Sequence, residues 1–472
     1  MTVDHLRELI ATTDTLVLVY FLGLNGFYAM LLVLSVPQLW RHWETYKDEH
    51  LTSYLSADSL PPITIVVPAY NMEQSICETT ECLLSLQYSR HEVIIVNDGS
   101  TDKTLDRLRE RYDLYEIPPV FRHPIPVQPI QAYYRSRIRP DLVVLDKLNG
   151  GKADSHNAAV GVARFPLLIL VDADTLLDHD ALIRLARVFL LDPHVAGAGA
   201  TIRIANGCVI RSHEVDEPRV SRNYIAGMQV PEYLRAFLFG RLGFNPLGGN
   251  LIVSGAFGIF RKDVLVEIAG FNAGSVAEDL DLCVRLHKHL LLSKRPYSVP
   301  FVPDPIAWTE APEDLATLAS QRERWHRGLI ATIWLNRDML FNPRYGRVGM
   351  ITLPFFALGE MLAPVVEAFG IVITAAGLWF GIIDWRAGAL FLAACWGYGM
   401  LLTVASVVLE EVTFRCYPRL RDFLLMILYA VLEPFGYRQL TLVWRLRGFW
   451  SAWRGSKSWG VMKRRGFASA QA

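Results

Sequence analysis

An apolar run over residues 16–36 constrains this chain more than any other feature of its sequence. Asn25 is its main interruption. At about 1.5 Å of rise per residue, a helix of this length crosses the roughly 30 Å hydrocarbon core of a bilayer. Acidic residues precede the run, and neither a basic start nor a small-residue cleavage site is present. Residues 1–45 are therefore predicted to be an uncleaved transmembrane anchor rather than a signal peptide.

A second apolar region covers residues 345–443, in runs near 349–380, 387–409 and 423–443. Hydrophobic residues make up 52% of the chain, which is high for a purely soluble protein. The region is predicted to form transmembrane or interfacial helices whose number stays open, because Pro354 and Pro364 favour a kink in the first run. The tail, 444–472, mixes Trp with Arg and Lys and suits the cytosolic membrane surface.

Charge and cysteine placement predict which side of the membrane the middle of the chain faces. Arg41, His42 and Lys47 follow the first apolar run, and the positive-inside tendency places what comes next in the cytosol of a multi-pass inner (plasma) membrane protein. The six cysteines are scattered without a CxxC pair, which fits a reducing compartment. Because the formal net charge is +0, no overall field favours nucleic acid, and no nucleic-acid partner is expected.

Between the apolar regions, residues 60–335 read as one cytosolic α/β domain. Short apolar runs at 63–67, 93–96, 142–145 and 167–171 alternate with amphipathic stretches. This alternation predicts a doubly wound, mostly parallel sheet. Active sites in such sheets gather at the carboxyl ends of the strands.

Acidic residues follow two of these runs directly. Asp172 and Asp174 form a DxD pair that can hold a hard divalent cation, Mg2+ or Mn2+, on the phosphates of a nucleotide-sugar. Asp98, in Val-Asn-Asp-Gly-Ser-Thr-Asp (96–102), and Tyr70 occupy the first two strand ends, where base and ribose contacts usually lie. Asp98 could equally serve turn chemistry and cap a helix that starts near Ser100.

Two further motifs bring charged groups together. Lys152 and Asp154 lie in Lys-Leu-Asn-Gly-Gly-Lys-Ala-Asp (147–154), where the glycines would allow close approach to phosphate; a flexible polar loop is the alternative. Glu278 and Asp279 precede a helical stretch. An inverting sugar transfer needs a carboxylate near the acceptor hydroxyl, so Asp279 is the candidate base, with helix capping as the alternative.

Gln321, Arg324 and Trp325 share one face of a helix predicted to start after Pro312, Glu313 and Asp314. The guanidinium can steady a departing phosphate, and the indole offers a flat platform to a sugar ring. The same face could instead anchor the helix at the membrane surface. Glu360 and Glu367 fall on one helix face within an apolar segment, where they either border a glycan channel or pair within the protein.

Taken in order, the Asp98 motif, Asp172-Ala-Asp174, Glu278-Asp279 and Gln321-x-x-Arg324-Trp325 resemble the family 2 glycosyltransferases, specifically the membrane-embedded processive synthases of cellulose, chitin, hyaluronan and poly-N-acetylglucosamine. The resemblance implies a GT-A fold, a UDP-sugar donor, a divalent metal, and a β-linked polysaccharide that is translocated through the same chain. It also implies a uridine contact at Asp98, diphosphate and metal contacts at Asp172 and Asp174, and diphosphate and acceptor contacts at Gln321, Arg324 and Trp325.

UDP-N-acetylglucosamine is favoured as donor over UDP-glucose, on the compact architecture alone. The stretch 458–465 is similar to the Trp-Gly-Thr-Arg switch of hyaluronan and chitin-type synthases, with Val461 in place of the Thr. Membrane lipid and the growing polysaccharide are the expected partners, and accessory secretion proteins remain open. The alternatives are a non-processive transferase that adds one sugar to a lipid carrier, and an inactive export scaffold.

Overall fold

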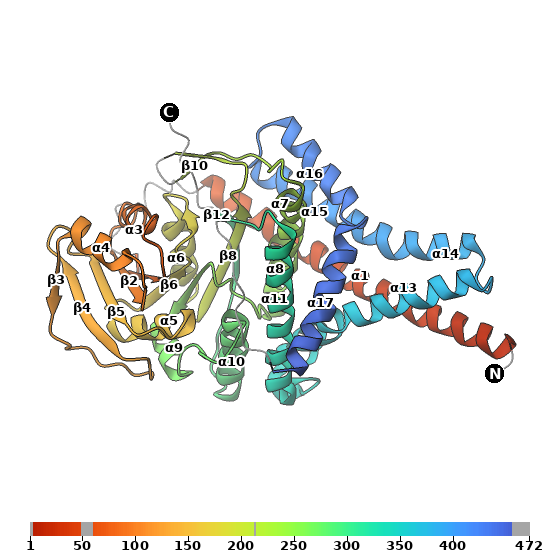
Figure 1. Cartoon of the computed structure of the whole chain (residues 1–472), viewed down its shortest axis with the longest axis horizontal. Helices are drawn as coiled ribbons and strands as arrows, with labels where there is room; N and C mark the ends of the chain where they lie inside the picture. Colours follow the sequence, from red (N-terminus) through yellow and green to blue (C-terminus); the bar gives the residue numbers. More distant parts are fainter. Residues whose placement is uncertain (1–2, 49–59, 212–213, 456–472) are drawn as a thin grey trace.

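The structure is a computed structural model that describes residues 3–48, 60–211 and 214–455. It has two visibly different parts (Figure 1): a sheet flanked by helices on the left, and an array of helices on the right from which α1 (Val3–Asp48), α13 (Ala363–Trp379) and α14 (Trp385–Leu392) extend as an arm. The stretch 458–465, the predicted switch, lies outside the described residues.

The sheet has ten strands in the order β3-β4-β5-β2-β1-β6-β11-β8-β12-β7. At its centre, β5 (Leu142–Lys147), β2 (His91–Asp98), β1 (Ile63–Ala69) and β6 (Leu167–Val171) pair in parallel. These four strands contain the apolar runs that the sequence singled out. Their nearly continuous burial fits the Val, Ile and Leu residues that make up their apolar runs.

Antiparallel pairing on both flanks makes the sheet mixed rather than mostly parallel. β11 (Phe257–Arg261) runs antiparallel to both β6 and β8 (Gly197–Ile204), and β12 (Phe301–Thr309) returns parallel to β8. On the far side β4 (Ile130–Ser136) pairs antiparallel with β5. The two edge strands of this sheet are β3 (Leu114–Ile117) and β7 (Thr175–Leu177), and β9 (Val209–Arg211) and β10 (Glu214–Glu217) form a separate two-stranded antiparallel sheet. The predicted α/β class is confirmed, with a mixed sheet in place of a mostly parallel one.

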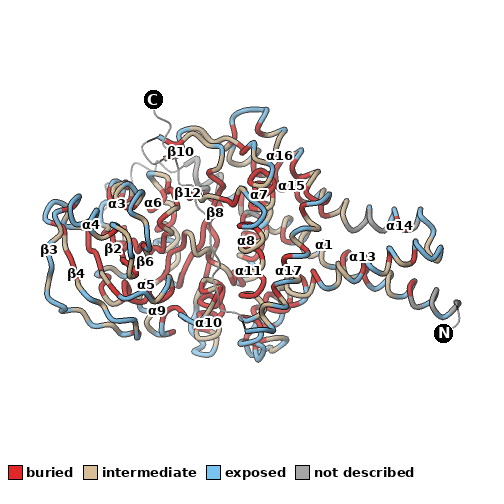
Figure 2. Tube along the Cα trace, in the orientation of Figure 1, coloured by how far each residue is buried: buried red, intermediate tan, exposed pale blue. Residues whose placement is uncertain are grey.

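Helices cover both faces of the sheet, and the sheet separates two apolar cores. One core joins the sheet to α3 (Ile76–Leu84), α4 (Thr104–Tyr112) and α6 (Ala181–Leu191). The other joins it to α5 (Lys152–Val162), α9 (Lys262–Glu267) and α10 (Glu278–Leu292). The strands are largely buried in Figure 2, whereas the extended arm is mostly half-buried or exposed. Such packing fixes the strand ends on which the polar motifs lie.

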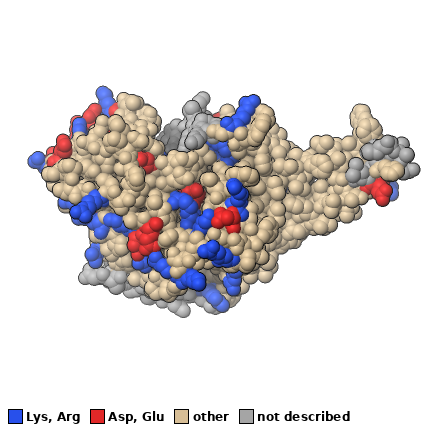
Figure 3. Space-filling view, turned by 90° about the horizontal axis from the view of Figure 1, so that it is seen from below, with Lys and Arg blue, Asp and Glu red and all other residues tan. Residues whose placement is uncertain are grey.

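Two helices of the described chain are long and apolar enough to cross a membrane, by length and composition. They cover Ile10–His42 and Val348–Trp379. The second contains Pro354 and Pro364, for which the sequence predicted a kink. Its regular α-helix is interrupted by the π-helical segments η5 (Val348–Thr352) and η6 (Phe356–Met361) on either side of α12 (Leu353–Phe355). Figure 3 shows few charged side chains on the arm, in contrast to the charged sheet domain.

The other helices connect the sheet to the arm: α7 (Tyr224–Tyr233), η1 (Leu234–Phe239), α8 (Gly240–Leu242), α11 (Leu315–Leu335), α15 (Tyr398–Phe414), α16 (Leu420–Leu432) and α17 (Tyr437–Trp453). The remaining described elements are three short 3-10 helices, η2 (Asn245–Leu247), η3 (Arg337–Met339) and η4 (Pro343–Tyr345), and the π-helical segment η7 (Ala393–Gly397). Helix α17 runs through residue 443, where the sequence suggested a boundary. It packs along α11, with the rings of His326 and Phe449 5.0 Å apart.

Candidate active site

The loops after β1, β2 and β6 carry the first group of predicted site residues. Tyr70 follows β1 and is half exposed, Asp98 ends β2, and Asp172 and Asp174 follow β6. The first two loops are tied together, because Asn71 Oδ1 accepts a hydrogen bond of 2.8 Å from the Thr101 amide. Adjacent parallel strands therefore deliver these side chains to one edge of the sheet.

Asp98 is held by a fully buried lysine. Lys147 Nζ donates to Asp98 Oδ1 at 2.6 Å and lies 3.1 Å from Asp154 Oδ2. The amides of Gly150 and Gly151 also donate to the Asp98 carboxylate, at 2.9 and 2.8 Å. Asp98 does not cap α4, which begins only at Thr104 after Lys103 as N-cap, so the capping alternative for Asp98 is wrong.

Asp154 is the predicted site residue that the structure places away from the others. It accepts hydrogen bonds from the Gln128 amide at 2.9 and 3.1 Å, in addition to its ion pair with Lys147. Its carboxylate is therefore satisfied inside the protein, behind Asp98. The sequence expected a ligand contact because it could not show that Lys147 turns inward to meet this side chain.

Lys152 joins two of the acidic motifs. Its Nζ lies 2.6 Å from Asp172 Oδ1 and 3.8 Å from Glu278 Oε1, and it donates to the Gly255 carbonyl at 2.8 Å. Burial opposes the charge on the amine, but Asp172 and Glu278 outweigh it and raise the pKa of Lys152. The pKa of Glu278 is raised by burial, against the lowering effect of Lys152. Lys152 and Glu278 therefore form a largely buried pair of opposite charges at the candidate site.

Asp279 lies in the first turn of α10, next to Glu278. Its Oδ2 accepts a hydrogen bond of 3.1 Å from the Gly255 amide, and its Oδ1 accepts one of 2.8 Å from the Leu280 amide. Gly255 eases this close approach, because a Cβ there would stand 3.1 Å from Lys152 Nζ and 3.5 Å from Asp279 Oδ2. Asp279 thus both contacts the helix start and faces the candidate site.

Helix α11 supplies Gln321, Arg324 and Trp325. It begins as predicted, with Asp314 accepting from the Thr317 amide at 2.9 Å as an N-cap. Gln321 is buried, and its Oε1 has no hydrogen-bond partner among the described residues. Trp325 is 39% exposed, so its ring stays available to a ligand.

One large cavity collects these groups, with a volume of about 1980 Å³. All the predicted site residues except Asp154 line it: Tyr70, Asp98, Lys152, Asp172, Asp174, Glu278, Asp279, Gln321, Arg324 and Trp325. The same cavity is also lined by residues of the two helices that are apolar enough to cross a membrane, including Asn25 of α1 and Glu360 of η6. The predicted site and the apolar helices therefore share one space.

The carboxylates in the apolar region both pair within the protein and line this cavity. Glu360 accepts from the Tyr28 hydroxyl and lies 3.4 Å from Arg445 Nη2. Glu367 takes a two-point contact from Arg438, at 2.8 and 3.3 Å. The two interpretations that the sequence left open for these residues, channel border and internal pairing, are thus compatible.

A divalent cation fits the donor chemistry of the strand-end pair. Asp172 and Asp174 offer hard carboxylate oxygens on one loop, and Mg2+ or Mn2+ commonly takes one or two carboxylates plus substrate phosphates. No cluster of three or more His, Cys, Asp or Glu side chains suited to a metal occurs in the described ranges. The remaining ligands would therefore have to come from a bound diphosphate and water.

The sequence reasoning missed the residues that support Trp325. The guanidinium of Arg322 lies 4.6 Å from the centre of the Trp325 ring. Arg322 Nη2 also donates to Glu232 Oε2 at 2.8 Å, which accepts from the Tyr437 hydroxyl at 2.7 Å. Arg322 lies inside the Gln-Arg-Glu-Arg-Trp stretch, so its charge could have marked it as a candidate. Its partners Glu232 and Tyr437 are far away in sequence, and no sequence pattern links them to it.

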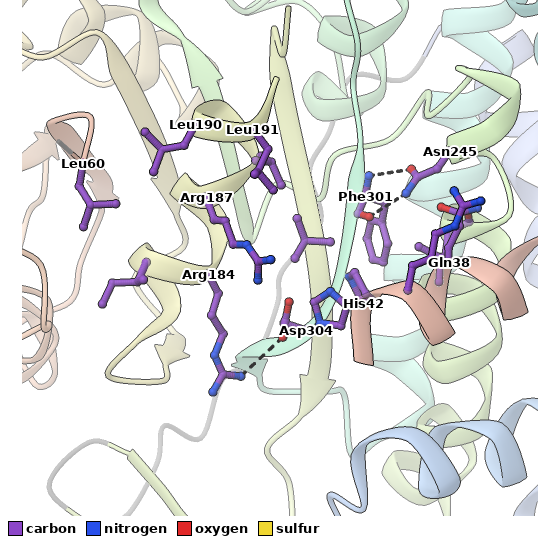
Figure 4. A pocket seen from close by; sticks show the side chains of 16 residues that line it. Gln38, His42, Leu60, Arg184, Arg187, Leu190, Leu191, Asn245, Phe301 and Asp304 are labelled. Carbon is purple, nitrogen blue, oxygen red and sulfur yellow. Dashed lines mark hydrogen bonds and ion pairs between the residues drawn. The ribbon is translucent and has the colours of Figure 1, made fainter. Parts of the chain in front are cut away.

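A second, smaller pocket lies between the end of α1, α6 and β12, with a volume of about 280 Å³. Figure 4 shows Asp304 there between Arg184 and His42, at 3.9 and 3.1 Å. None of the predicted site residues lines this pocket. The candidate active site is therefore the large cavity.

Comparison with known proteins agrees with the motifs. The profile described as "Glycosyl transferase family group 2" matches residues 167–446, and the profile described as "Glycosyl transferase family 2" matches residues 64–136. The chain is 26% identical over 275 residues to the poly-beta-1,6-N-acetyl-D-glucosamine synthase of Staphylococcus aureus (strain COL), covering 58% of this chain and 56% of that protein. It is 24% identical over 267 residues to the synthase of Staphylococcus epidermidis, covering 56% and 54%.

The aligned region spans about half the length of these curated relatives. Among solved structures, the chain aligns with the mannosyltransferase PcManGT from Pyrobaculum calidifontis in complex with GDP-Man and Mn2+, at 17% identity and a TM-score of 0.49. That alignment covers 89% of this chain and 99% of the other.

Proposed function

The chain belongs to the glycosyl transferase family group 2 and is a glycosyltransferase, and from that premise we propose that it polymerises a UDP-sugar into a β-linked polysaccharide and passes the product into the membrane. UDP-N-acetylglucosamine is the proposed donor, because the Staphylococcus relatives are poly-beta-1,6-N-acetyl-D-glucosamine synthases. UDP-glucose is the next candidate.

The shared cavity carries this proposal. A transferase that adds one sugar needs only a pocket for donor and acceptor. A polymerase also needs a path along which the polysaccharide can move away while its growing end stays at the site. Here the space around Asp172, Asp279 and Trp325 is continuous with the space bordered by the apolar helices. Polar pairs along it, such as Glu367 with Arg438, offer hydrogen-bond partners to sugar hydroxyls.

In this proposal the donor lies along the strand ends. Tyr70 and Asp98 contact the uridine, while Lys152, Gln321 and Arg324 contact the diphosphate. Asp172 and Asp174 would hold the divalent cation, which when bound neutralises the diphosphate as it leaves. Asp154 acts indirectly, because it holds Lys147 and Lys147 holds Asp98.

Asp279 is the proposed base of the transfer. The acceptor hydroxyl attacks the anomeric carbon from the side opposite the diphosphate, a new glycosidic C–O bond forms, and the bond from that carbon to the diphosphate oxygen breaks. Asp279 takes the proton of the hydroxyl, UDP leaves with the bonding electrons, and the configuration inverts. Buried Glu278 stabilises the charged amine of Lys152 beside the leaving group. The ring of Trp325 supports the acceptor sugar.

The proposed placement follows from the apolar helices. Residues 1–45 anchor the chain, residues 60–335 form a cytosolic transferase domain, and residues 345–443 supply transmembrane or interfacial helices in the inner (plasma) membrane. The exposed apolar side chains of α1 and α13, among them Leu16, Val33 and Val372, suit contact with lipid tails.

The test is incorporation of radiolabelled sugar by the full chain, purified in detergent with Mg2+ or Mn2+, across a panel of UDP-sugars. We expect a long polymer from UDP-N-acetylglucosamine. A product one sugar long that partitions into organic solvent would instead establish transfer to a lipid carrier. Absence of any product from all donors, with UDP still bound, would point to an inactive export scaffold.

A further inference from the structure

Arg241 is a half-buried cation on the wall of the large cavity that no motif and no step above uses. It lies in α8, and its guanidinium carbon stands 4.0 Å from the centre of the Phe237 ring. The Tyr233 and Phe237 rings stack with centroids 5.2 Å apart. All three residues line the same cavity as Asp279 and Trp325.

The guanidinium is incompletely satisfied by the protein. Nη1 of Arg241 is out of contact with solvent and has no hydrogen-bond partner among the described residues. Burial lowers the pKa of Arg241 to about 10, although Asp279, Cys283 and Tyr233 act in the opposite direction. Buried donors that lack a partner are rare in folded proteins, because each loses its hydration without replacement. A ligand in the cavity would supply the missing acceptor.

Asp279 does not take that role. The described residues show no hydrogen bond or ion pair between Arg241 and Asp279, and Asp279 Oδ2 is already engaged by the Gly255 amide at 3.1 Å. In the proposed donor placement Lys152, Gln321 and Arg324 contact the diphosphate, which leaves Arg241 for the acceptor sugar. The missing acceptor is therefore best supplied by an uncharged oxygen of a sugar.

We propose that Arg241 is a specificity-determining residue that donates a hydrogen bond from Nη1 to the carbonyl oxygen of an acetamido group on the acceptor sugar. This inference rests on the proposed function, since it assumes that the acceptor end of an N-acetylglucosamine polymer lies beside Asp279. The carbonyl is a strong neutral acceptor, and the stacked Phe237 and Tyr233 rings offer an apolar surface to the acetamido methyl.

The experiment measures binding rather than turnover. The Kd of a short β-linked N-acetylglucosamine oligomer and of a glucose oligomer of equal length is determined with the full chain in detergent and UDP present. For Arg241→Met we expect the first Kd to rise about 10- to 100-fold, as for loss of a hydrogen bond to a charged group, and the second to change little. For Arg241→Lys we expect the Kd of the N-acetylglucosamine oligomer to rise less than for Arg241→Met.

Arg337→Met is the matched control, because Arg337 also lies over an aromatic ring, Trp334 at 4.9 Å, but does not line the cavity. It should leave both Kd values unchanged. Equal weakening of both oligomers by Arg241→Met, or no weakening of either, overturns the inference. If Arg241→Met does not fold, as judged by UDP binding, the same comparison with Arg241→Lys decides. Polymer synthesis by the unchanged protein tests the proposed function separately.

Discussion

Lys147 and Lys152 belong to one short segment, and each lies between two carboxylates, yet their surroundings differ. Lys147 Nζ contacts Asp98 and Asp154 and donates to the Leu148 carbonyl, and its side chain is 0% exposed. Lys152 contacts Asp172 and Glu278, lines the large cavity, and its side chain is 16% exposed. The first lysine is satisfied by the protein alone. The second can exchange a protein carboxylate for a ligand.

The difference shows that a charged motif must be divided by where its side chains point. Both lysines stand in the same Lys-Leu-Asn-Gly-Gly-Lys stretch, and each pairs with two carboxylates. Removing one partner from a dry ion pair leaves an uncompensated charge and destabilises the fold, whereas a group facing a cavity retains water or ligand as partner. The Lys147 cluster is therefore expected to act mainly on stability and, through Asp98, on UDP binding, and the Lys152 cluster on kcat.

The largest effect is expected at Asp279, which lines the large cavity together with Lys152. Asp279→Asn should lower kcat by roughly 10²- to 10⁴-fold, because the acceptor hydroxyl loses its proton acceptor. UDP binding and melting temperature should be retained. Initial rates of sugar incorporation and UDP titrations measure both.

The matched control for this change lies on the same helix. Asp281 is buried, pairs with Arg285 at 2.7 Å, and does not line the cavity. Asp281→Asn should lower the melting temperature and leave kcat within a few-fold. Loss of activity in Asp281→Asn with full activity in Asp279→Asn would reverse the assignment of the base.

The two lysines themselves give the most direct comparison. Lys147→Met should cost roughly 3–5 kcal/mol of folding stability, because two buried carboxylates lose their counter-charge. Lys152→Met should change the melting temperature less but lower kcat about 100-fold or more, through loss of a cation near the diphosphate. Thermal melts and initial rates on both variants measure this. Equal effects of the two substitutions on both quantities would contradict the division.

The central strands were predictable because they are local. Each of the runs 63–67, 93–96, 142–145 and 167–171 carries its own burial signal, and parallel neighbours bring their carboxyl ends together wherever they lie in the sheet. This is why Asp98, Asp172 and Asp174 could be grouped from the sequence. The antiparallel insertion of β11 between β6 and β8 was not predictable, since strand order depends on pairing across long connections.

The site residues follow the same rule. Gln321, Arg324 and Trp325 share a helix face through local spacing, so their grouping was visible. The inward turn of Asp154 depends on Lys147 and on the Gln128 amide. The support of Trp325 depends on Glu232 and Tyr437, which are remote in sequence. Charge and residue type indicate a candidate, but only the tertiary partner decides which way the side chain faces.

The pH dependence of activity should also separate the two lysines. Burial raises the pKa of Glu278 and Lys152 lowers it, so Lys152→Met should raise the pKa of Glu278 further. If transfer needs ionised Glu278, the acid limb of the pH–rate profile moves to higher pH in Lys152→Met. Lys147→Met should leave that limb in place. A limb that shifts to lower pH in Lys152→Met would exclude Glu278 as the titrating group.

The smallest effect is expected from two glycines, one in each cluster. A Cβ at Gly255 would stand 3.1 Å from Lys152 Nζ, so Gly255→Ala should displace the lysine by a few tenths of an ångström and lower kcat about three- to tenfold, with little change in melting temperature. Gly151 has a φ of +84° and open space around its Cβ position. Gly151→Ala should therefore cost roughly 1–2 kcal/mol through backbone strain next to Asp98, while kcat changes less. Melting curves and initial rates on the pair decide: if Gly255→Ala mainly destabilises and Gly151→Ala mainly slows transfer, the roles assigned to the two lysine clusters are exchanged.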